Sequence, residues 1–265
     1  MTSRGVLLFF LCAALFSGCS TEYNLATKQE EWIYYSTDQE VQMGRSIAKA
    51  INKEYKPLND PLVQKRVEDI GKKIAAVCDR KEISYHFYAI EDKQDPNAFS
   101  LPGGFIYVNS KLLDMVSNDD ELACVLGHEV AHVVARHSMK KLQASMGYSL
   151  FRVLLATAPV EGSGDLGYGS DVAFTIVMLG YSREDELLAD QFGTRYARAA
   201  GYDGRGMITF LEKLRAYDRR QPLRAQSYFK THPYIPDRIR IVKQELGEKT
   251  SFDDYINIEQ EPHKQ

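Results

Sequence analysis

The sequence predicts an α+β domain that is mostly helical, with a small β-sheet beside one central helix. Residues 128–137 contain His-Glu-x-x-His without Gly or Pro, and they follow the acidic and amide residues 118–121, which suit the start of a helix. Apolar residues recur with helical periodicity over much of the remaining chain. Residues 83–90 and 97–108 instead show the alternation of strands, and a Pro-Gly-Gly turn divides the second segment.

The first half of the chain supplies two helices before these strands. Thr37-Asp38-Gln39-Glu40 has the pattern of a capping box and predicts a helix that runs to about Tyr55. Asp60-Pro61 predicts the start of a second helix, whose apolar side extends to Val77.

The second half continues with helices on either side of a glycine-rich loop. Residues 146–160 are apolar but short and contain Arg152, so a core or groove-lining helix is expected rather than a membrane span. Residues 161–170 hold four glycines and are expected to form a loop. Two more helices are expected, over residues 171–181 and from a Ser182 cap to about residue 200.

Composition favours one globular domain. The chain has 265 residues, of which 44% are apolar and 26% are charged, with a net charge of −3. It contains no basic block, which argues against nucleic acid as a partner. The predicted parts are a lipoprotein signal peptide (1–18), a polar tether (19–35), one domain (36–248) and a polar C-terminal tail (249–265).

The N-terminus has the pattern of a bacterial lipoprotein. Arg4 precedes an apolar run over residues 5–16, and Leu15-Phe16-Ser17-Gly18-Cys19 resembles a lipobox, although Leu is usual in place of Phe16. We expect Cys19 to be lipidated and to become the mature N-terminus; an ordinary cleaved signal peptide or an uncleaved anchor are the alternatives. Ser20 resembles proteins sorted to the Gram-negative outer membrane, so the expected location is that membrane, facing the periplasm, with acyl chains as anchor.

Two cysteines lie within the predicted domain, in a compartment that permits disulfides. Cys124 precedes His128 by one helical turn and is expected to be a buried apolar residue rather than a ligand. The sequence leaves open whether Cys78 and Cys124 form a disulfide.

The His-Glu-x-x-His motif predicts a zinc site. On a helix, His128 and His132 project from one face one turn apart, so both imidazoles can reach one tetrahedral metal. Glu129 lies about 100° away, where it can contact a water on the metal without binding the metal itself. His137 lies about 140° round an unbroken helix from His132 and is therefore expected to face away from the metal, as a surface or outer-shell histidine.

A catalytic zinc needs a third protein ligand, and the remaining candidates are His232 or a carboxylate. Glu186 and Asp190 are one turn apart on a later helix, whose stripe of small residues (Ala189, Gly193, Ala197) matches a stripe on the metal helix (Gly127, Ala131, Ala135). Alone, Glu-x-x-x-Asp is usually a solvated face. With matching stripes the two helices can pack closely, so we expect Glu186 to bind zinc and Asp190 to accept a hydrogen bond from a ligand histidine.

The two motifs together resemble the HtpX/CAAX-prenyl-protease-like zinc metallopeptidases (metallopeptidase family 48), a gluzincin family. Asn97-Ala98-Phe99, Thr231-His232-Pro233 and Arg238 also resemble that family, and the similarity covers roughly residues 36–246. It implies a zinc endopeptidase with a mostly helical gluzincin core and one Zn²⁺ per chain. The chain is most similar to the secreted, lipid-anchored bacterial branch, which implies envelope proteins as substrates and quality control at the outer membrane.

The expected mechanism assigns a role to each polar residue. Glu129 acts as the general base on zinc-bound water. His232 donates to the tetrahedral oxyanion, occupies the open zinc position in a latent state, or only caps a helix. The strands beside the metal helix offer an edge to an extended peptide, with Asn97, Ala98 and Gly104 as candidate substrate-binding residues, or they form a plain structural hairpin.

Two other functions fit the same residues. One is a non-proteolytic zinc lipoprotein that acts as a chaperone or assembly factor, against which Glu129 argues because structural zinc needs no carboxylate there. The other is a hydrolase of cell-wall peptides. The sequence specifies neither the physiological substrate nor the oligomeric state.

Overall fold

The computed structural model describes residues 20–24, 29–145, 170–219, 231–233 and 235–250. The expected helix over residues 146–160, most of the glycine-rich loop, Cys19 and the end of the C-terminal tail lie outside these ranges. The described elements are β1 (Ser20–Asn24), β2 (Gln29–Ile33), α2 (Thr37–Glu54), α3 (Pro61–Val77), β3 (His86–Ile90), β4 (Ala98–Leu101), β5 (Phe105–Asn109), α4 (Ser110–Met115), α5 (Asp119–Val134), α7 (Ser170–Val177), α8 (Arg183–Ala199), α9 (Arg205–Arg219) and α11 (Ile235–Glu245).

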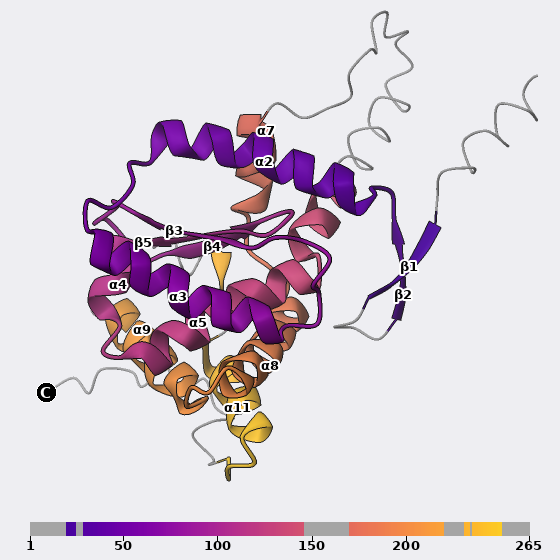
Figure 1. Ribbon diagram of the computed structural model, residues 1–265. Helices are drawn as coiled ribbons and strands as arrows, with labels where there is room; N and C mark the ends of the chain where they lie inside the picture. The colour runs from indigo at the N-terminus through magenta and orange to yellow at the C-terminus, as the bar shows by residue number, and fades with distance from the viewer. Residues whose placement is uncertain (1–19, 25–28, 146–169, 220–230, 234, 251–265) are drawn as a thin grey trace, which may run out of the picture.

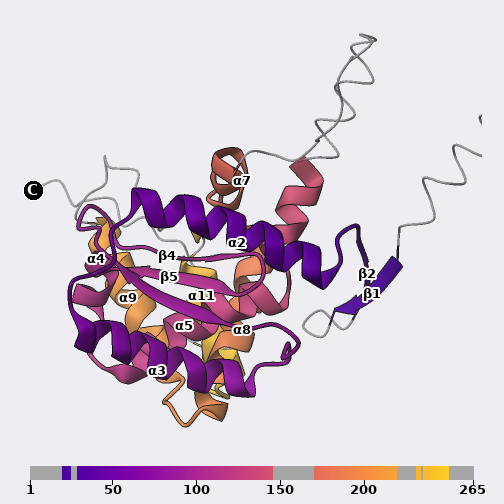
Figure 2. The same ribbon diagram turned by 45° about the horizontal axis from the view of Figure 1, so that its top comes forward.

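A three-stranded sheet forms the middle layer of the domain. Its order is β3-β5-β4, with β3 parallel and β4 antiparallel to β5. Helix α2 crosses one face of the sheet, and α3 and α5 lie on the other, followed by α8, α9 and α11 (Figures 1 and 2). This arrangement confirms the predicted α+β class. Among the described residues, no helix has both the length and the apolar character needed to cross a membrane.

The sheet separates two apolar cores, because successive strand residues point to opposite faces. Phe87, Ile106 and Val108 pack with α3, α5, α8 and α9. Phe105 and Tyr107 pack with α2 on the other face. The central helix α5 therefore lies inside the larger core, and all of its residues from Glu121 to Val134 are buried.

The capping box of α2 lies one residue earlier than predicted. Ser36 is the N-cap, and it exchanges hydrogen bonds with Gln39. Glu40 does not fold back onto the helix start, because its carboxylate is buried and accepts hydrogen bonds from Arg80 at 2.8–2.9 Å and from the amide of Gly103 at 3.1 Å. Because Arg80 holds the side chain of Glu40, that side chain is not available at the start of the helix. Gln39 is the capping-box partner of Ser36 instead.

The first strand of the sheet is shorter than the predicted segment 83–90. It begins at His86, whose partner Phe105 is the first residue of β5. The chain turns through Gly103 and Gly104, at φ values of 73° and 94°, and β5 begins directly after this turn. In the region predicted as a tether, the backbones of β1 and β2 pair as an antiparallel ladder.

Helices α5 and α8 approach each other at the predicted stripes of small residues. A Cβ built on Gly127 would lie 2.6 Å from the carbonyl oxygen of Gly193, and one built on Gly193 would lie 2.6 Å from the amide nitrogen of His128. Only glycine at both positions permits this backbone separation. The close approach brings the side chains of His128 and Glu186 within reach of each other.

Both described cysteines are free and buried, so the structure contains no Cys78–Cys124 disulfide. The thiol of Cys124 faces the backbone carbonyls of Asp203 and Gly204 at 3.7 Å, and burial raises its pKa. The predicted role of Cys124 as a buried apolar residue is confirmed.

Candidate metal centre

Helix α5 supplies three residues of the candidate metal centre, namely His128, Glu129 and His132. Asn118 caps the helix as expected, with its side chain accepting from the amide of Glu121 at 2.9 Å. One turn apart, His128 Nε2 and His132 Nε2 lie 3.0 Å from each other. Glu129 is fully buried between them along the chain, and neither of its carboxylate oxygens has a hydrogen-bond partner among the described residues.

Helix α8 and residues 231–233 complete the cluster. Glu186 Oε1 lies 3.4 Å from His132 Nε2 and 3.0 Å from His232 Nδ1. His232 Nδ1 also lies 3.2 Å from His128 Nε2. One ligand atom from each of these four buried residues lies within 4.8 Å of the other three. The predicted ligands and His232 therefore meet at one point.

These four side chains fit a zinc ion. Ligand nitrogens about 2.0–2.1 Å from a tetrahedral zinc are about 3.3–3.4 Å apart. Four of the separations here are 3.0–3.4 Å, His128 Nε2 lies 3.6 Å from Glu186 Oε2, and all of the ligand atoms lie within 4.8 Å of one another. Burial lowers the pKa of His132 well below its ordinary value, so the imidazole is neutral, which is the metal-binding form. At formal charge, the buried carboxylates of Glu129, Glu186 and Asp190 and the guanidinium of Arg238 leave two negative charges. A divalent cation would offset them.

The outer nitrogen of His128 faces Asp190, as the spacing on α8 predicts. His128 Nδ1 lies 2.8 Å from Asp190 Oδ1. Arg238 binds the same carboxylate through Nε at 2.7 Å and Nη2 at 2.8 Å, and its Nη1 lies 2.9 Å from Glu186 Oε2. Burial alone would raise the pKa of Asp190, but Arg238 and His128 outweigh it and hold that pKa below its ordinary value. Asp190 is therefore an ionised acceptor for His128.

Arg238 is the residue of the centre that sequence reasoning noticed only through the family resemblance. A local signal was present: on α11, Arg238 lies three residues after Ile235 and four before Val242, both of which are buried. A cation on the apolar face of a helix must meet a buried anion, because an unpaired buried charge is costly. The position of Arg238 therefore predicts a buried carboxylate partner, but the sequence does not identify which carboxylate it is.

The prediction that His137 faces away from the metal site is wrong. Helix α5 ends at Val134, and Arg136 adopts φ 55°, so the chain leaves the helix before residue 137 and starts another helical segment over 137–145. His137 is buried, and its Nδ1 lies 2.7 Å from His132 Nδ1. The expectation assumed one unbroken helix. Of the two roles considered, the structure excludes the surface histidine.

A tyrosine that the sequence did not single out lies against the other side of His132. The ring of Tyr181 stacks on that imidazole with centroids 3.9 Å apart, and its hydroxyl lies 2.9 Å from Ser138 Oγ. Tyr181 directly precedes the Ser182 cap of α8, so the packing of α8 on α5 places it there. It keeps the His132 ring in a fixed plane.

His232 links the metal cluster to the sheet. Its Nε2 donates to the carbonyl oxygen of Ala98 on β4 at 3.2 Å, which leaves Nδ1 pointing at the cluster. Asn97 is also close, since its Oδ1 accepts from the hydroxyl of Thr231 at 3.4 Å. Asn97 and Ala98, two of the three substrate-binding candidates, thus lie beside the centre.

Gly104 does not lie with the other two substrate-binding candidates. In the β4–β5 hairpin Ala98 pairs with Val108, whereas Leu101 pairs with Phe105 next to the turn that contains Gly104. The carbonyl oxygen of Gly104 accepts from the amide of His86 at 2.8 Å, on the β3 side of the sheet. Gly104 therefore lies at the turn end of the hairpin, whereas Ala98 lies at its other end.

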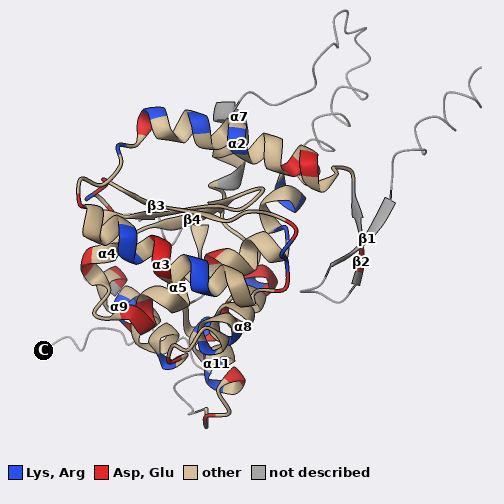
Figure 3. Cartoon of the chain, in the orientation of Figure 1, with Lys and Arg blue, Asp and Glu red and all other residues tan. Residues whose placement is uncertain are grey.

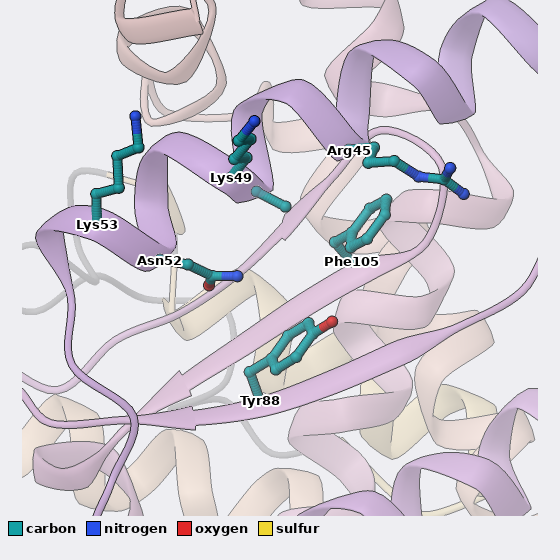
Figure 4. A pocket seen from close by; sticks show the side chains of 7 residues that line it. Arg45, Lys49, Asn52, Lys53, Tyr88 and Phe105 are labelled. Atoms are coloured by element: carbon teal, nitrogen blue, oxygen red, sulfur yellow. The ribbon is translucent and has the colours of Figure 1, made fainter.

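A separate pocket of about 400 Å³ lies between α2 and the opposite edge of the sheet. Figure 4 shows its aromatic side chains, Tyr88 and Phe105, beneath cations from α2, and Figure 3 shows Lys and Arg along that helix. The lining residues are Arg45, Ala48, Lys49, Asn52, Lys53, Tyr88 and Phe105. None of them belongs to the metal cluster, so this pocket is distinct from the candidate centre.

Comparison with known proteins agrees with the geometry. The chain is 35% identical over 185 residues to the mitochondrial metalloendopeptidase OMA1 of Schizosaccharomyces pombe, covering 69% of this chain and 52% of that protein. It is 28% identical over 211 residues to the beta-barrel assembly-enhancing protease of Escherichia coli, covering 77% and 43%. The chain thus spans about half the length of these relatives. The metalloprotease LoiP of Escherichia coli is 26% identical over 263 residues, covering 93% of this chain and 98% of that protein.

The family model described as Peptidase family M48 matches residues 61–246, which include all four side chains of the cluster together with Glu129, Asp190 and Arg238. A match over most of the chain, with four candidate metal ligands brought together in space, leads to one conclusion. The chain belongs to peptidase family M48.

Proposed function

We propose that this protein is a zinc-dependent endopeptidase that hydrolyses peptide bonds of cell-envelope proteins. The observation that carries the proposal is Glu129. It is a fully buried carboxylate with no hydrogen-bond partner among the described residues, and its Oε1 lies 3.5 Å from Nε2 of His232 in the cluster. Burial without a close hydrogen-bond partner disfavours a charge, so a carboxylate kept at this position calls for a functional reason. General-base catalysis supplies that reason.

In the proposed mechanism, His128, His132 and Glu186 would hold the metal, which would supply Lewis acidity and make water a better nucleophile near neutral pH. Glu129 takes the proton of the attacking water and passes it to the amine of the leaving peptide. The ion pair of Asp190 with Arg238 orients His128 through its outer nitrogen. The burial of these residues excludes bulk water, which strengthens each electrostatic contact.

The substrate is proposed to bind along β4. In the order β3-β5-β4 this strand is at the end of the sheet, and none of the described strands pairs with its outer edge. An extended peptide can bind such an edge through backbone hydrogen bonds. Ala98 lies on this edge and its carbonyl oxygen reaches His232, so a peptide added there would lie against the metal centre. Protein or peptide substrates are inferred on this basis.

The metal assignment predicts one zinc per chain and a strong dependence on Glu186. Replacing Glu186 with Ala removes the carboxylate ligand, so zinc binding is expected to weaken greatly and hydrolysis to be lost. Metal analysis and chelator competition of the purified variant measure this. Glu184→Ala, on the same helix turn but not in the cluster, is the control. Full zinc occupancy at normal affinity in Glu186→Ala would contradict the assignment.

His232 is proposed to occupy the fourth metal position in a latent state, because Nδ1 faces the ligand atoms and Nε2 already uses the Ala98 carbonyl of the substrate edge. Replacing His232 with Ala frees both, so the rate of peptide hydrolysis is expected to rise while zinc is retained. A fall of about 10²–10³-fold would instead identify His232 as an oxyanion donor. An unchanged rate, zinc affinity and pH profile would leave it a structural cap.

The proposed location is the outer membrane, facing the periplasm, with Cys19 as the lipidated N-terminus. This rests on the apolar run that ends in Ser17-Gly18-Cys19, and acyl chains bind membranes by burying methylene groups. Mass spectrometry of the protein isolated from membranes is expected to show a chain that begins at Cys19 and carries acyl groups. Cys19→Ala is expected to abolish the modification. An unmodified chain beginning at another residue would contradict the proposal.

A second function is a chaperone or assembly factor without proteolysis. The name of one relative, beta-barrel assembly-enhancing protease, refers to both assembly and proteolysis. The two functions differ in their need for Glu129, since holding a partner requires the fold and the metal but not a general base.

A further inference from the structure

The contacts of His132 contain a feature that the proposed mechanism does not use. Its outer nitrogen, Nδ1, faces the Nδ1 of His137 at 2.7 Å, while His137 Nε2 lies 3.1 Å from Asp185 Oδ1. His137 is buried, and Asp185 lies in the first turn of α8. We propose that His137 and Asp185 are a positioning pair that fixes the tautomer and orientation of the zinc ligand His132.

The hydrogen bonds allow one assignment of the protons. His132 Nε2 faces the other ligand atoms, so in the metal-bound form its proton is on Nδ1. That N–H can then donate only to an unprotonated Nδ1 of His137. The proton of neutral His137 is therefore on Nε2, where it donates to the Asp185 carboxylate. Every donor in this chain of three side chains has an acceptor.

The two ligand histidines of α5 thus have different outer partners. His128 donates directly to Asp190, whose charge is shared with Arg238. His132 donates to a neutral imidazole, and the carboxylate follows one residue further out. Outer hydrogen bonds of this kind raise the basicity of a metal ligand and hold its ring in place.

The backbone shows that the position of His137 is maintained by other parts of the fold. Arg136 has φ 55°, a conformation that residues other than glycine seldom adopt. Its side chain lies 3.2 Å from Glu40 Oε2 and donates to Thr37 Oγ1 at 2.8 Å, both on α2. These contacts hold the turn that redirects the chain after α5, and the turn brings His137 back to His132.

The other oxygen of Asp185 is held as well. Asp185 is the N3 residue of the capping box of α8, so its Oδ2 accepts from the amide of Ser182 at 3.3 Å while Oδ1 faces His137. The same carboxylate therefore connects the start of α8, which carries Glu186, to the end of α5, which carries His132. The positioning pair couples the packing of both ligand-bearing helices.

The test measures zinc affinity of the full-length protein by chelator competition, a quantity independent of peptide hydrolysis. His137→Ala removes the acceptor for His132 and is expected to weaken zinc binding about 10–100-fold, the usual effect of losing such a partner. His137→Asn places an amide oxygen near the position of Nδ1, so it is expected to recover most of that loss. The exposed histidine of β3 provides the control variant His86→Ala, which is expected to bind zinc as the wild type does.

A second control separates the capping box from the positioning pair. Ser182→Ala removes the serine that caps α8 but leaves Asp185 Oδ1 beside His137, so it is expected to lower stability without weakening zinc binding. Nitrogen NMR of the zinc-loaded wild type reports the tautomer directly, even where a variant fails to fold. His137 is expected to carry its proton on Nε2.

The proposal rests on zinc binding by His132, which is part of the proposed function. If the wild type binds zinc and His137→Ala binds it equally well, the positioning role is wrong and the proposed function stands. A proton on Nδ1 of His137 in the wild type would also overturn it. If the wild type binds no zinc, the proposed function fails first and this inference fails with it.

Discussion

Replacing Glu129 with Gln is expected to reduce peptide hydrolysis by about 10²–10⁴-fold, the range attributed to one general acid–base group. The amide has the size of the carboxylate but cannot accept the proton of the attacking water. Zinc binding is expected to persist, because Glu129 is not among the four side chains of the cluster. Rates on an unfolded protein substrate, measured with zinc supplied, give the comparison.

Glu121 offers a matched control on the same helix. It is also a buried glutamate of α5, but its carboxylate binds Lys213 at 2.6 Å and Thr209 at 2.9 Å rather than facing the centre. Glu121→Gln is expected to cost some stability and to leave hydrolysis unchanged. If Glu129→Gln keeps the wild-type rate, the protein is not a peptidase of the proposed kind, and the chaperone function becomes the better explanation.

The parts that could be predicted from sequence are those set by local chemistry. Asp60 and Asn118 cap helices where the sequence indicates, because an N-cap side chain bonds to amides only two or three residues away. The matching stripes around Gly127 and Gly193 predicted a close helix pair, because two helix backbones can approach each other wherever side chains are small or absent. These local rules placed His128, His132 and Glu186 at one point.

The parts that could not be predicted depend on where the chain changes direction. The left-handed turn at Arg136, held by Glu40 from a helix about a hundred positions earlier, moved His137 from the expected outer face into contact with His132. In the same way, the turn of the hairpin carries Gly104 away from Ala98, although the two residues are close in sequence. No short window of sequence contains both partners of such contacts.

Arg238 is another residue whose partners could not be predicted from a short window of sequence. Its position on the apolar face of α11 was readable from the sequence, but its two acidic partners lie on α8. Burying a guanidinium with two carboxylates costs desolvation that good geometry must repay. The contribution of Arg238 to the free energy of unfolding is therefore best measured by replacing this residue.

Replacing Arg238 with Met is expected to destabilise the metal-free protein by about 3–5 kcal/mol, the usual cost of breaking a buried ion pair by removing one partner. Methionine fills the space but leaves Asp190 and Glu186 without their cation, and both are fully buried. Denaturant unfolding in the presence of a chelator measures the change. Zinc is expected to reduce the deficit, because a divalent cation offsets the charge of Glu186.

The matched control is Arg195→Met on α8. Arg195 also binds a carboxylate with two contacts, to Glu245 at 2.5 and 2.8 Å, but its side chain is 47% exposed. Removing it is expected to cost only about 0–1 kcal/mol, because solvent screens an exposed pair. Adding Asp190→Asn to Arg238→Met removes one of the stranded charges and is expected to restore part of the stability. An Arg238→Met variant that unfolds at the wild-type denaturant concentration would show that the buried carboxylates do not depend on this guanidinium.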